Sequence, residues 1–206
     1  AGTQVTAMTQ PRTIYDFYGF PPELYAATYP APGSPDLAER VRQVVKAAEV
    51  RPDLTWGLDH GTWSVLKRLF PAADVPVVQF SLDGALDMSQ HYQLGKQLAE
   101  LREEGILILG SGNIVHNLGI MRWGEEAFDW AKDYDVKVRQ WILEGDHDPI
   151  IQYKKHGQAG LLAVNSAEHY EPLVYILAMK EAGEPISFFA EKVTFGSISM
   201  RSVRIG

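Results

Sequence analysis

The sequence predicts an α/β fold, a single-domain sandwich in which helices flank a central mixed β-sheet. Two apolar runs without polar alternation, residues 75–82 and 106–109, are typical of short strands buried on both faces. Amphipathic stretches alternate with these runs along the chain, which is the order expected of a layered α/β domain. The length of 206 residues suits one domain with a sizeable core.

Helix and strand signals follow one another in a regular order. Ser34 is suited to cap a helix that has Pro35 at its first position. Gly105 is suited to end a different helix, predicted over 89–104. Apolar residues at helical spacing mark the buried face of each predicted helix. The predicted strands are 5–8, 54–57, 75–82, 106–109, 186–190 and 197–205, the last two antiparallel. The first predicted helix begins after Ser34. Further helices are predicted over 62–70, 89–104, 125–144, 148–155 and 173–182.

Residues 11–35 form a long connection that is rich in proline and in aromatic side chains. Connections of this length are usually functional or are packed down by their own side chains. The aromatic residues therefore indicate a packed lid or an oligomer contact, or else simple anchoring of the loop to the core.

Composition restricts the classes of partner and of chemistry. A net charge of -7 argues against nucleic acid as a partner, and no apolar run reaches the roughly 20 residues of a membrane span. Because cysteine is absent, a metal site would have to use imidazole and carboxylate ligands, which suit non-haem iron, manganese or zinc. The sequence has no signal-peptide pattern, so the expected location is cytoplasmic.

His116 follows the predicted strand 106–109 and the loop Gly110-Ser111-Gly112-Asn113. Loops at the carboxyl ends of strands commonly carry the reactive groups of α/β proteins, so His116 is a candidate metal ligand or base. The alternative is a histidine that merely bonds a loop carbonyl. The loop lacks the third glycine of a dinucleotide-binding motif, and Leu109 replaces the first glycine of a nucleophile elbow.

Two further histidines lie at the ends of predicted elements. His60 precedes a helix whose positive end favours a neutral imidazole, which can accept a proton; alternatively it only braces Asp59. His169 lies in a segment where Asn165 and Glu168 have the spacing of a capping box. His91, His147 and His156 are expected to be solvated, because their surroundings are helical or charged.

Several longer motifs resemble class III extradiol ring-cleavage dioxygenases of the LigB type, in the bacterial branch similar to DOPA 4,5-dioxygenase. The resemblance covers essentially the whole chain in the same order. The motifs are TIYDFYGFP (13–21), YPAPGSP (29–35), GLDHGTW (57–63), VPVVQFSLD (75–83), SGNIVHN (111–117), EHYEPLVY (168–175) and GSISMRSVRIG (196–206).

The resemblance implies an enzyme that opens a catechol ring with both atoms of O₂ at a non-haem Fe(II) or Zn²⁺ centre. His116 and His169 match metal-binding histidines of the family, and His60 matches a histidine that lies beside the ligands and takes part in catalysis. The family's ligand in the EH motif is assigned to His169, with Glu168 as the alternative. The implied partners are a small catechol and O₂, without nucleic acid or membrane, and a homo-oligomer is left open.

One departure from the family concerns its first two histidine motifs, of HGSP and AHW type. Neither occurs in this sequence, which begins with Ala1-Gly2. We therefore expect residues 1–206 to be a class III extradiol dioxygenase domain that lacks its N-terminal strand and these two motifs. The alternatives to a working dioxygenase are a truncated or non-catalytic metal-binding domain, and a hydrolase or isomerase that reuses the fold.

Overall fold

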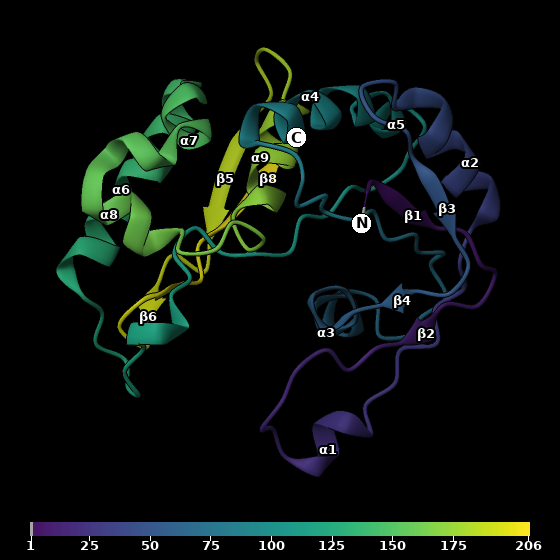
Figure 1. Ribbon diagram of the computed structural model, residues 1–206, viewed down its shortest axis with the longest axis horizontal. Helices are drawn as coiled ribbons and strands as arrows, with labels where there is room; N and C mark the ends of the chain where they lie inside the picture. The colour runs from purple at the N-terminus through teal and green to yellow at the C-terminus, as the bar shows by residue number, and fades with distance from the viewer. Residues whose placement is uncertain (1) are drawn as a thin grey trace. The chain divides into compact units, whose positions relative to one another are not determined.

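The computed structural model describes residues 2–206, in which short strands and helices come first, a long run of helices follows, and four strands end the chain (Figure 1). The chain folds as two units that divide between Ala85 and Leu86. The mixed α/β composition agrees with the prediction. Each unit has a hydrophobic cluster of its own.

The N-terminal unit is built from two short parallel strand pairs and three helices. β1 (Gln4–Thr6) pairs with β3 (Arg51–Asp53), and β2 (Arg12–Thr13) pairs with β4 (Gly57–Leu58). The helices are α1 (Pro22–Tyr25), α2 (Pro35–Val44) and α3 (His60–Leu69).

Side-chain caps fix where the two longer helices of this unit begin. The Ser34 hydroxyl accepts a hydrogen bond from the N–H of Leu37 at 3.2 Å, as the sequence predicts. Asp59 does the same for α3, because its carboxylate accepts from the N–H of Thr62 at 3.0 Å. The cap on Asp59 places His60 at the first residue of α3.

The aromatic segment of this unit is held down by its own side chains. Tyr15 donates a hydrogen bond to the carbonyl of Ala27 at 2.8 Å, and its ring lies edge-on to Phe17 and Trp63. Tyr29 is buried and donates to the carbonyl of Phe70 at 2.9 Å. These contacts support anchoring among the alternatives considered for residues 11–35.

The C-terminal unit contains most of the helices and the two antiparallel strand pairs. Its helices are α4 (Met88–Leu98), α5 (Glu100–Glu103), η1 (Leu118–Ile120), α6 (Asp129–Glu144), α7 (Asp148–Ile151), η2 (Tyr153–His156), α8 (Gly157–Ala163) and α9 (Glu171–Ala178). Its strands are β5 (Ile186–Phe189), β6 (Val193–Thr194), β7 (Ile198–Ser199) and β8 (Ser202–Ile205). β5 pairs with β8 in antiparallel fashion, as predicted for the end of the chain (Figure 1). The predicted strand 197–205 is divided into β7 and β8, and β7 pairs antiparallel with β6, which was not predicted.

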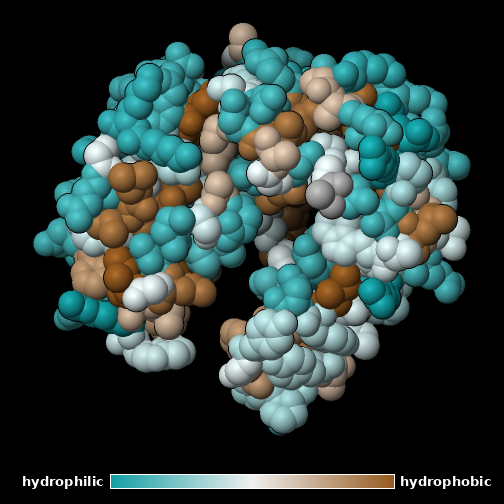
Figure 2. Space-filling model, viewed as in Figure 1, coloured by the Kyte–Doolittle hydropathy of each residue, from teal (hydrophilic) through white to brown (hydrophobic). Residues whose placement is uncertain are grey.

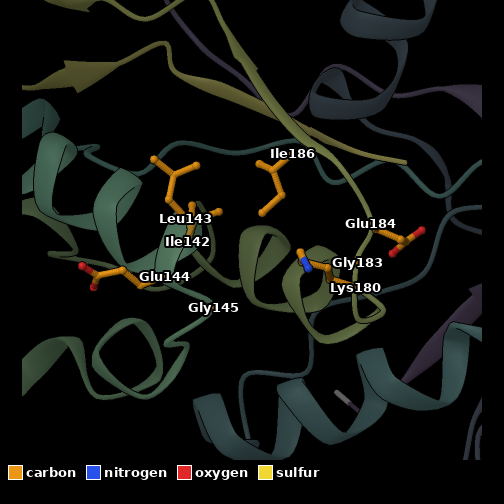
Figure 3. Close-up of a pocket in the computed structure, with 8 residues that line it drawn as sticks. All are labelled: Ile142, Leu143, Glu144, Gly145, Lys180, Gly183, Glu184 and Ile186. Carbon is orange, nitrogen blue, oxygen red and sulfur yellow. The ribbon is translucent and has the colours of Figure 1, made fainter.

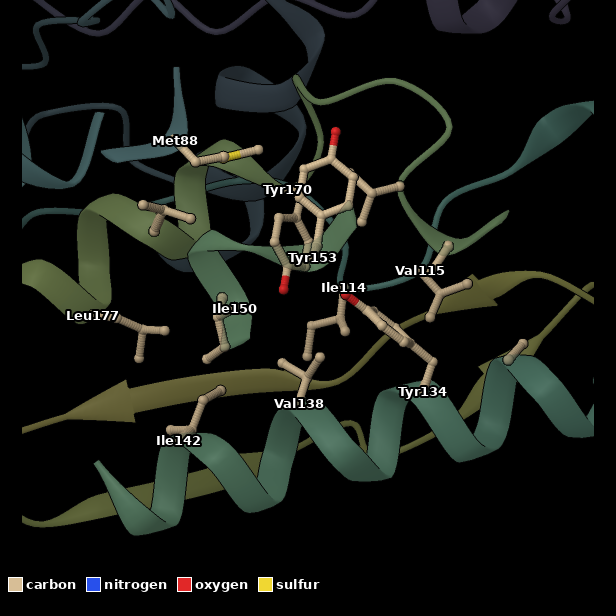
Figure 4. Packing of buried hydrophobic residues seen from close by; sticks show 14 residues of the cluster. Met88, Ile114, Val115, Tyr134, Val138, Ile142, Ile150, Tyr153, Tyr170 and Leu177 are labelled. Atoms are coloured by element: carbon tan, nitrogen blue, oxygen red, sulfur yellow. The ribbon is translucent and has the colours of Figure 1, made fainter. Parts of the chain in front are cut away.

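The core of this unit forms around one face of α6. Tyr134, Val138 and Ile142 project from that face toward Ile114 and Tyr153 (Figure 4). All five are buried, and Val138 and Ile142 have no exposed surface. The helix period of the apolar residues therefore does position α6 as the sequence predicts, although the helix begins at Asp129 and not at residue 125.

A buried ion pair ties α6 to the last strands. Both Nε and Nη2 of Arg201 contact Oδ2 of Asp135, at 2.9 and 2.6 Å. The other carboxylate oxygen of Asp135 accepts a hydrogen bond from the Ser199 hydroxyl at 2.6 Å. Because Asp135 is 2% exposed, this network fully satisfies a carboxylate that would otherwise be costly to bury.

The predicted central mixed sheet is not observed. Residues 2–206 form four separate two-stranded sheets. Residues 75–82 make a single bridge, between Phe80 and Val5. The ladder does not extend because the N–H of Gln79 bonds the side chain of Thr6, at 2.7 Å, and not a backbone carbonyl.

The prediction of a buried strand at residues 106–109 is also wrong. No strand pairing forms there among the described residues, and Leu107 is 69% exposed. The N–H of Ile106 still bonds the carbonyl of Leu101, which closes the preceding helix. An apolar run indicates burial only where other elements cover both of its faces, and here they do not.

Other boundaries shift for local reasons. Residues 126–128 pair with Gly196 and so delay the start of α6. α9 begins at Glu171 because Pro172 suits a first helical turn, and α8 was not predicted.

No helix among residues 2–206 has the length and apolar character needed to cross a lipid bilayer. Figure 2 shows hydrophilic and hydrophobic residues mixed over the drawn surface of each unit.

The α6 core gives a direct stability prediction. Ile142→Ala should lower the free energy of unfolding by about 2–5 kcal/mol, because it leaves a cavity at a fully buried position. The matched control is Leu143→Ala on the same helix, where the side chain is 47% exposed and the cost should be small. Urea unfolding of both variants tests this, and equal losses would contradict the described packing.

Candidate functional site

His116 lies in an extended segment held between two other parts of the C-terminal unit. It forms a parallel bridge with Val164 and an antiparallel bridge with Ile198. Its backbone N–H donates to the carbonyl of Ala163 at 2.9 Å. Pairing on both sides fixes the backbone of His116 and therefore the direction of its side chain.

Asn117 reinforces this placement. Its side-chain amide donates to the carbonyl of Leu162 at 2.8 Å, and its own carbonyl accepts from the buried hydroxyl of Ser197 at 2.7 Å. The Asn117 side chain thus joins the His116 segment to the end of α8, and its backbone joins the segment to the residues before β7. Asn117 directly follows His116 in the motif SGNIVHN, and its structural role was not predicted from the sequence.

His169 is placed by the glycine-rich loop 110–113. The N–H of Asn113 donates to the carbonyl of His169 at 2.7 Å. A Cβ atom at Gly112 would overlap that same carbonyl, so only glycine lets the two backbones approach so closely. The loop that ends in Asn113 therefore leads into the segment of His116 and also contacts the backbone of His169.

The two imidazole rings lie face to face. Their centroids are 3.5 Å apart and their planes differ by 12°. The structure thus brings together the two residues predicted as metal ligands, although they are far apart in sequence.

Burial and the neighbouring ring keep His116 neutral. Desolvation, with the positive charge that His169 would carry, lowers the pKa of His116 from 6.5 to about 4, against a smaller opposing effect of Glu168. At neutral pH the His116 ring therefore has a free lone pair, which is the state that binds a metal or accepts a proton.

Glu168 supplies a carboxylate close to the pair. Burial acts to raise its pKa, but the hydrogen bond from Ser166, with both imidazoles nearby, lowers it below the usual value. The Ser166 hydroxyl donates to Glu168 Oε1 at 2.7 Å. The predicted capping box with Asn165 is not formed, because Glu168 bonds Ser166 and α9 begins only at Glu171.

The donor types at this site suit a first-row divalent metal. Imidazole and carboxylate are ligands used by iron and zinc, and both types are present here. A single ion bonded at about 2 Å to both rings needs nitrogens no more than about 4 Å apart, which the ring separation allows. Because nearly parallel rings aim their lone pairs along parallel lines, binding one ion requires the rings to tilt.

The site provides only part of a coordination sphere. Within residues 2–206, no group of three or more His, Cys, Asp or Glu side chains is arranged to hold one ion. His116 and His169 therefore fit as two ligands of a metal. The other coordination positions would be left for further ligands, water or substrate.

A buried polar cluster lies next to this site on α4 and α9. His91 has no exposed surface, so the prediction that it is solvated is wrong. Its Nδ1 lies 2.9 Å from the Tyr175 hydroxyl, and its Nε2 lies 3.5 Å from Glu171. Helical periodicity alone did not reveal that His91 occupies the inner face of α4.

His147 and His156 are also only partly solvated. Nδ1 of His147 lies 2.8 Å from the Tyr92 hydroxyl, and Nε2 of His156 lies 3.0 Å from the carbonyl of Pro149. Neither of these contacts involves His116 or His169.

His60 belongs to the N-terminal unit, where it is the first residue of α3. Its backbone N–H donates to Asp16 Oδ1 at 3.0 Å, and the same oxygen lies 2.9 Å from its ring Nδ1. The ring of His60 contacts Asp16, whereas the carboxylate of Asp59 accepts from Thr62. The alternative that His60 only braces Asp59 is therefore not observed. Sequence reasoning missed Asp16, although it lies within the TIYDFYGFP motif.

A shallow pocket of about 360 Å³ is located elsewhere in the C-terminal unit (Figure 3). It lies between the end of α6 and the turn that precedes β5. Its lining combines Lys180 and Glu144 with the apolar side chain of Ile186, and includes no histidine. Its chemistry does not match that of the predicted site, so we do not assign the site to it.

The close approach at Gly112 predicts a specific loss. Gly112→Ala should lower the free energy of unfolding by about 1–3 kcal/mol and weaken Zn²⁺ binding, because the new methyl group pushes His169 away. Gly84→Ala is the matched control, since nothing lies within 4 Å of a Cβ there. Denaturation and zinc titration measure both effects, and unchanged zinc affinity in Gly112→Ala would contradict the placement of His169.

The lowered pKa of His116 predicts an acid-dependent stability in the metal-free protein. Because the pKa is about 4 when folded and 6.5 when unfolded, the unfolded chain binds more protons between these values. The free energy of unfolding should thus be fully retained above pH 6.5 and fall by about 1–2 kcal/mol toward pH 4, a value reduced for partial exposure. His116→Gln should remove most of this fall, and an identical pH profile would contradict the assignment.

Comparison with known proteins places the chain in a family. A family model described as the catalytic LigB subunit of aromatic ring-opening dioxygenase matches residues 3–204. A 4,5-DOPA dioxygenase extradiol of Escherichia coli K12 is 42% identical over 211 residues, which cover 100% of this chain and 78% of the relative. A protein of the same name from Beta vulgaris is 39% identical, over 84% of this chain and 65% of the relative.

A solved structure agrees. An uncharacterized protein from Escherichia coli K12 has a TM-score of 0.85 and 39% sequence identity, and the match covers 100% of this chain and 81% of that one. The resemblance found in the sequence motifs is therefore confirmed, and the chain belongs to the LigB family of aromatic ring-opening dioxygenases.

Proposed function

We propose that this protein is a metal-dependent extradiol dioxygenase that opens the ring of a DOPA-like catechol with both atoms of O₂. Membership of the LigB family and the names of the relatives support the reaction class. The observation that carries the proposal is the His116–His169 pair, which presents stacked imidazoles beside a carboxylate.

His116 and His169 are the proposed ligands of a non-haem Fe(II) or Zn²⁺ ion. When bound, the metal supplies Lewis acidity that makes the catechol hydroxyls easier to deprotonate. The low pKa of His116 keeps its ring neutral at physiological pH, so its lone pair is available without prior loss of a proton. Glu168 remains the alternative ligand, and its hydrogen bond to Ser166 holds it ionised.

Proton transfer is the second proposed task of the chain's own residues. Deprotonating a catechol requires a group with a free lone pair, and a neutral imidazole has one only while it does not bind the metal. We assign this role to His116, or to a neighbouring group when the lone pair of His116 is bound to the metal, and we assign to His60 the handling of a proton at a later step. The assignment of His60 rests on the resemblance in the GLDHGTW motif.

A second candidate function is a non-catalytic metal-binding domain of the same fold. It is favoured by one observation, that residues 2–206 contain no group of three ligating side chains. Such a domain would bind zinc or iron weakly and would not consume O₂. Metal content and turnover, measured on the same sample, separate the two functions.

The decisive experiment is anaerobic reconstitution of the protein with Fe(II), followed by O₂ uptake with a panel of catechols. We expect uptake together with a yellow ring-opened product. His116→Ala should abolish turnover, because it removes the imidazole proposed as metal ligand or base, whereas the matched variant His156→Ala should retain it. Absence of uptake with every catechol would refute the enzyme proposal, and full activity of His116→Ala would clear that residue of any role.

A further inference from the structure

A carboxylate in the N-terminal unit contacts both the backbone and the ring of His60. Asp16 Oδ1 accepts the His60 N–H at 3.0 Å and lies 2.9 Å from Nδ1 of the ring. Asp16 follows β2, whereas His60 begins α3. One oxygen atom therefore fixes the histidine at two points across 44 positions of sequence.

The contact determines which ring nitrogen carries the proton. Nδ1 of His60 is shielded from solvent, and the Asp16 oxygen, although it lies 2.9 Å away, does not have the geometry of a hydrogen-bond acceptor for a ring N–H. A lone pair on Nδ1 would nevertheless face a carboxylate oxygen at 2.9 Å, which is repulsive. A neutral ring in this position therefore carries its hydrogen on Nδ1 and its lone pair on Nε2.

Part of the His60 ring remains accessible. The His60 side chain is 45% exposed even though its Nδ1 is shielded. Phe17 packs edge-to-face against the ring with centroids 5.6 Å apart, which restricts its rotation. Asp16 and Phe17 thus both contact the ring, while much of the side-chain surface stays open to a ligand.

We propose that Asp16 is a positioning residue for His60, which it holds in the Nδ1–H tautomer so that Nε2 accepts a proton or hydrogen bond from a phenolic substrate. The inference rests on the proposed dioxygenase function for its catalytic consequence. Its structural part, the control of the tautomer, stands on the contacts of Asp16 alone. The interaction resembles the way in which buried carboxylates orient catalytic histidines in other enzymes.

Asp16→Asn isolates the charge of this side chain. If the amide oxygen faces His60, it still accepts the His60 N–H and the negative charge beside Nδ1 is gone; if the NH₂ group faces His60, it can donate to a lone pair on Nδ1. Either orientation weakens the preference for hydrogen on Nδ1. The variant should therefore move the hydrogen of the ring from Nδ1 to Nε2. The matched control is Asp53→Asn, because Asp53 also accepts backbone hydrogen bonds, from Thr55 and Trp56, but touches no histidine.

The tautomer is read from the ¹⁵N shifts of both ring nitrogens at alkaline pH, in the full chain. His60→Gln identifies the signals by their loss. We expect Nδ1–H in the wild type and in Asp53→Asn, and a shift toward Nε2–H in Asp16→Asn. A wild-type ring protonated at Nε2, or an unchanged tautomer in Asp16→Asn, would overturn the proposal.

Steady-state kinetics tests the catalytic consequence. Asp16→Asn should lower kcat about 10- to 100-fold with little change in KM, the range typical of residues that orient another functional group. In a His60→Gln background the same change should cost nothing further, because the residue that Asp16 orients is gone. An equal additional loss there would show that Asp16 does not act through His60.

The two readouts distinguish the failure of this inference from the failure of the proposed function. If the wild type turns over no catechol, the dioxygenase proposal fails, and the tautomer of His60 alone decides the role of Asp16. If the wild type is active and the tautomer does not respond to Asp16→Asn, the positioning role fails while the dioxygenase remains.

Discussion

Two imidazole rings stacked 3.5 Å apart repel each other strongly if both are protonated, and this constraint shapes the site of the C-terminal unit. Burial, the larger effect, and this repulsion together lower the pKa of His116 to about 4, so its ring is neutral at physiological pH. A neutral His116 beside an ionised carboxylate is poor at binding an anion but suits a divalent cation. The electrostatics of the pair therefore supports the proposed metal site.

The fold maintains this arrangement through backbone contacts and not through the rings themselves. Bridges to Val164 and Ile198 fix His116, while Asn113 and the bare backbone of Gly112 receive the carbonyl of His169. The Arg201–Asp135 pair and Ser199 connect the strands that carry Ile198 to α6. The position of two side chains thus depends on hydrogen bonds spread over most of the C-terminal unit.

Local sequence signals predicted local structure well and long-range pairing poorly. The cap at Ser34 and the apolar face of α6 rest on interactions within one turn or one helix face, which composition and period reveal. The strands expected at 75–82 and 106–109 depend on partners elsewhere in the chain, and apolar runs contain no information on whether those partners are present. His91 was misjudged for the same reason, because its burial comes from α9.

The site was predicted through the resemblance, since spacing alone does not show that His116 and His169 meet. Asp16 and Gly112 were missed because their importance comes from what they touch in three dimensions. The most direct test of a shared metal is anomalous diffraction from crystals of this protein grown with Zn²⁺ as a redox-inert probe. The account predicts one strong peak about 2 Å from a ring nitrogen of both His116 and His169. A peak bonded to only one of these rings, or located elsewhere in the molecule, would contradict it.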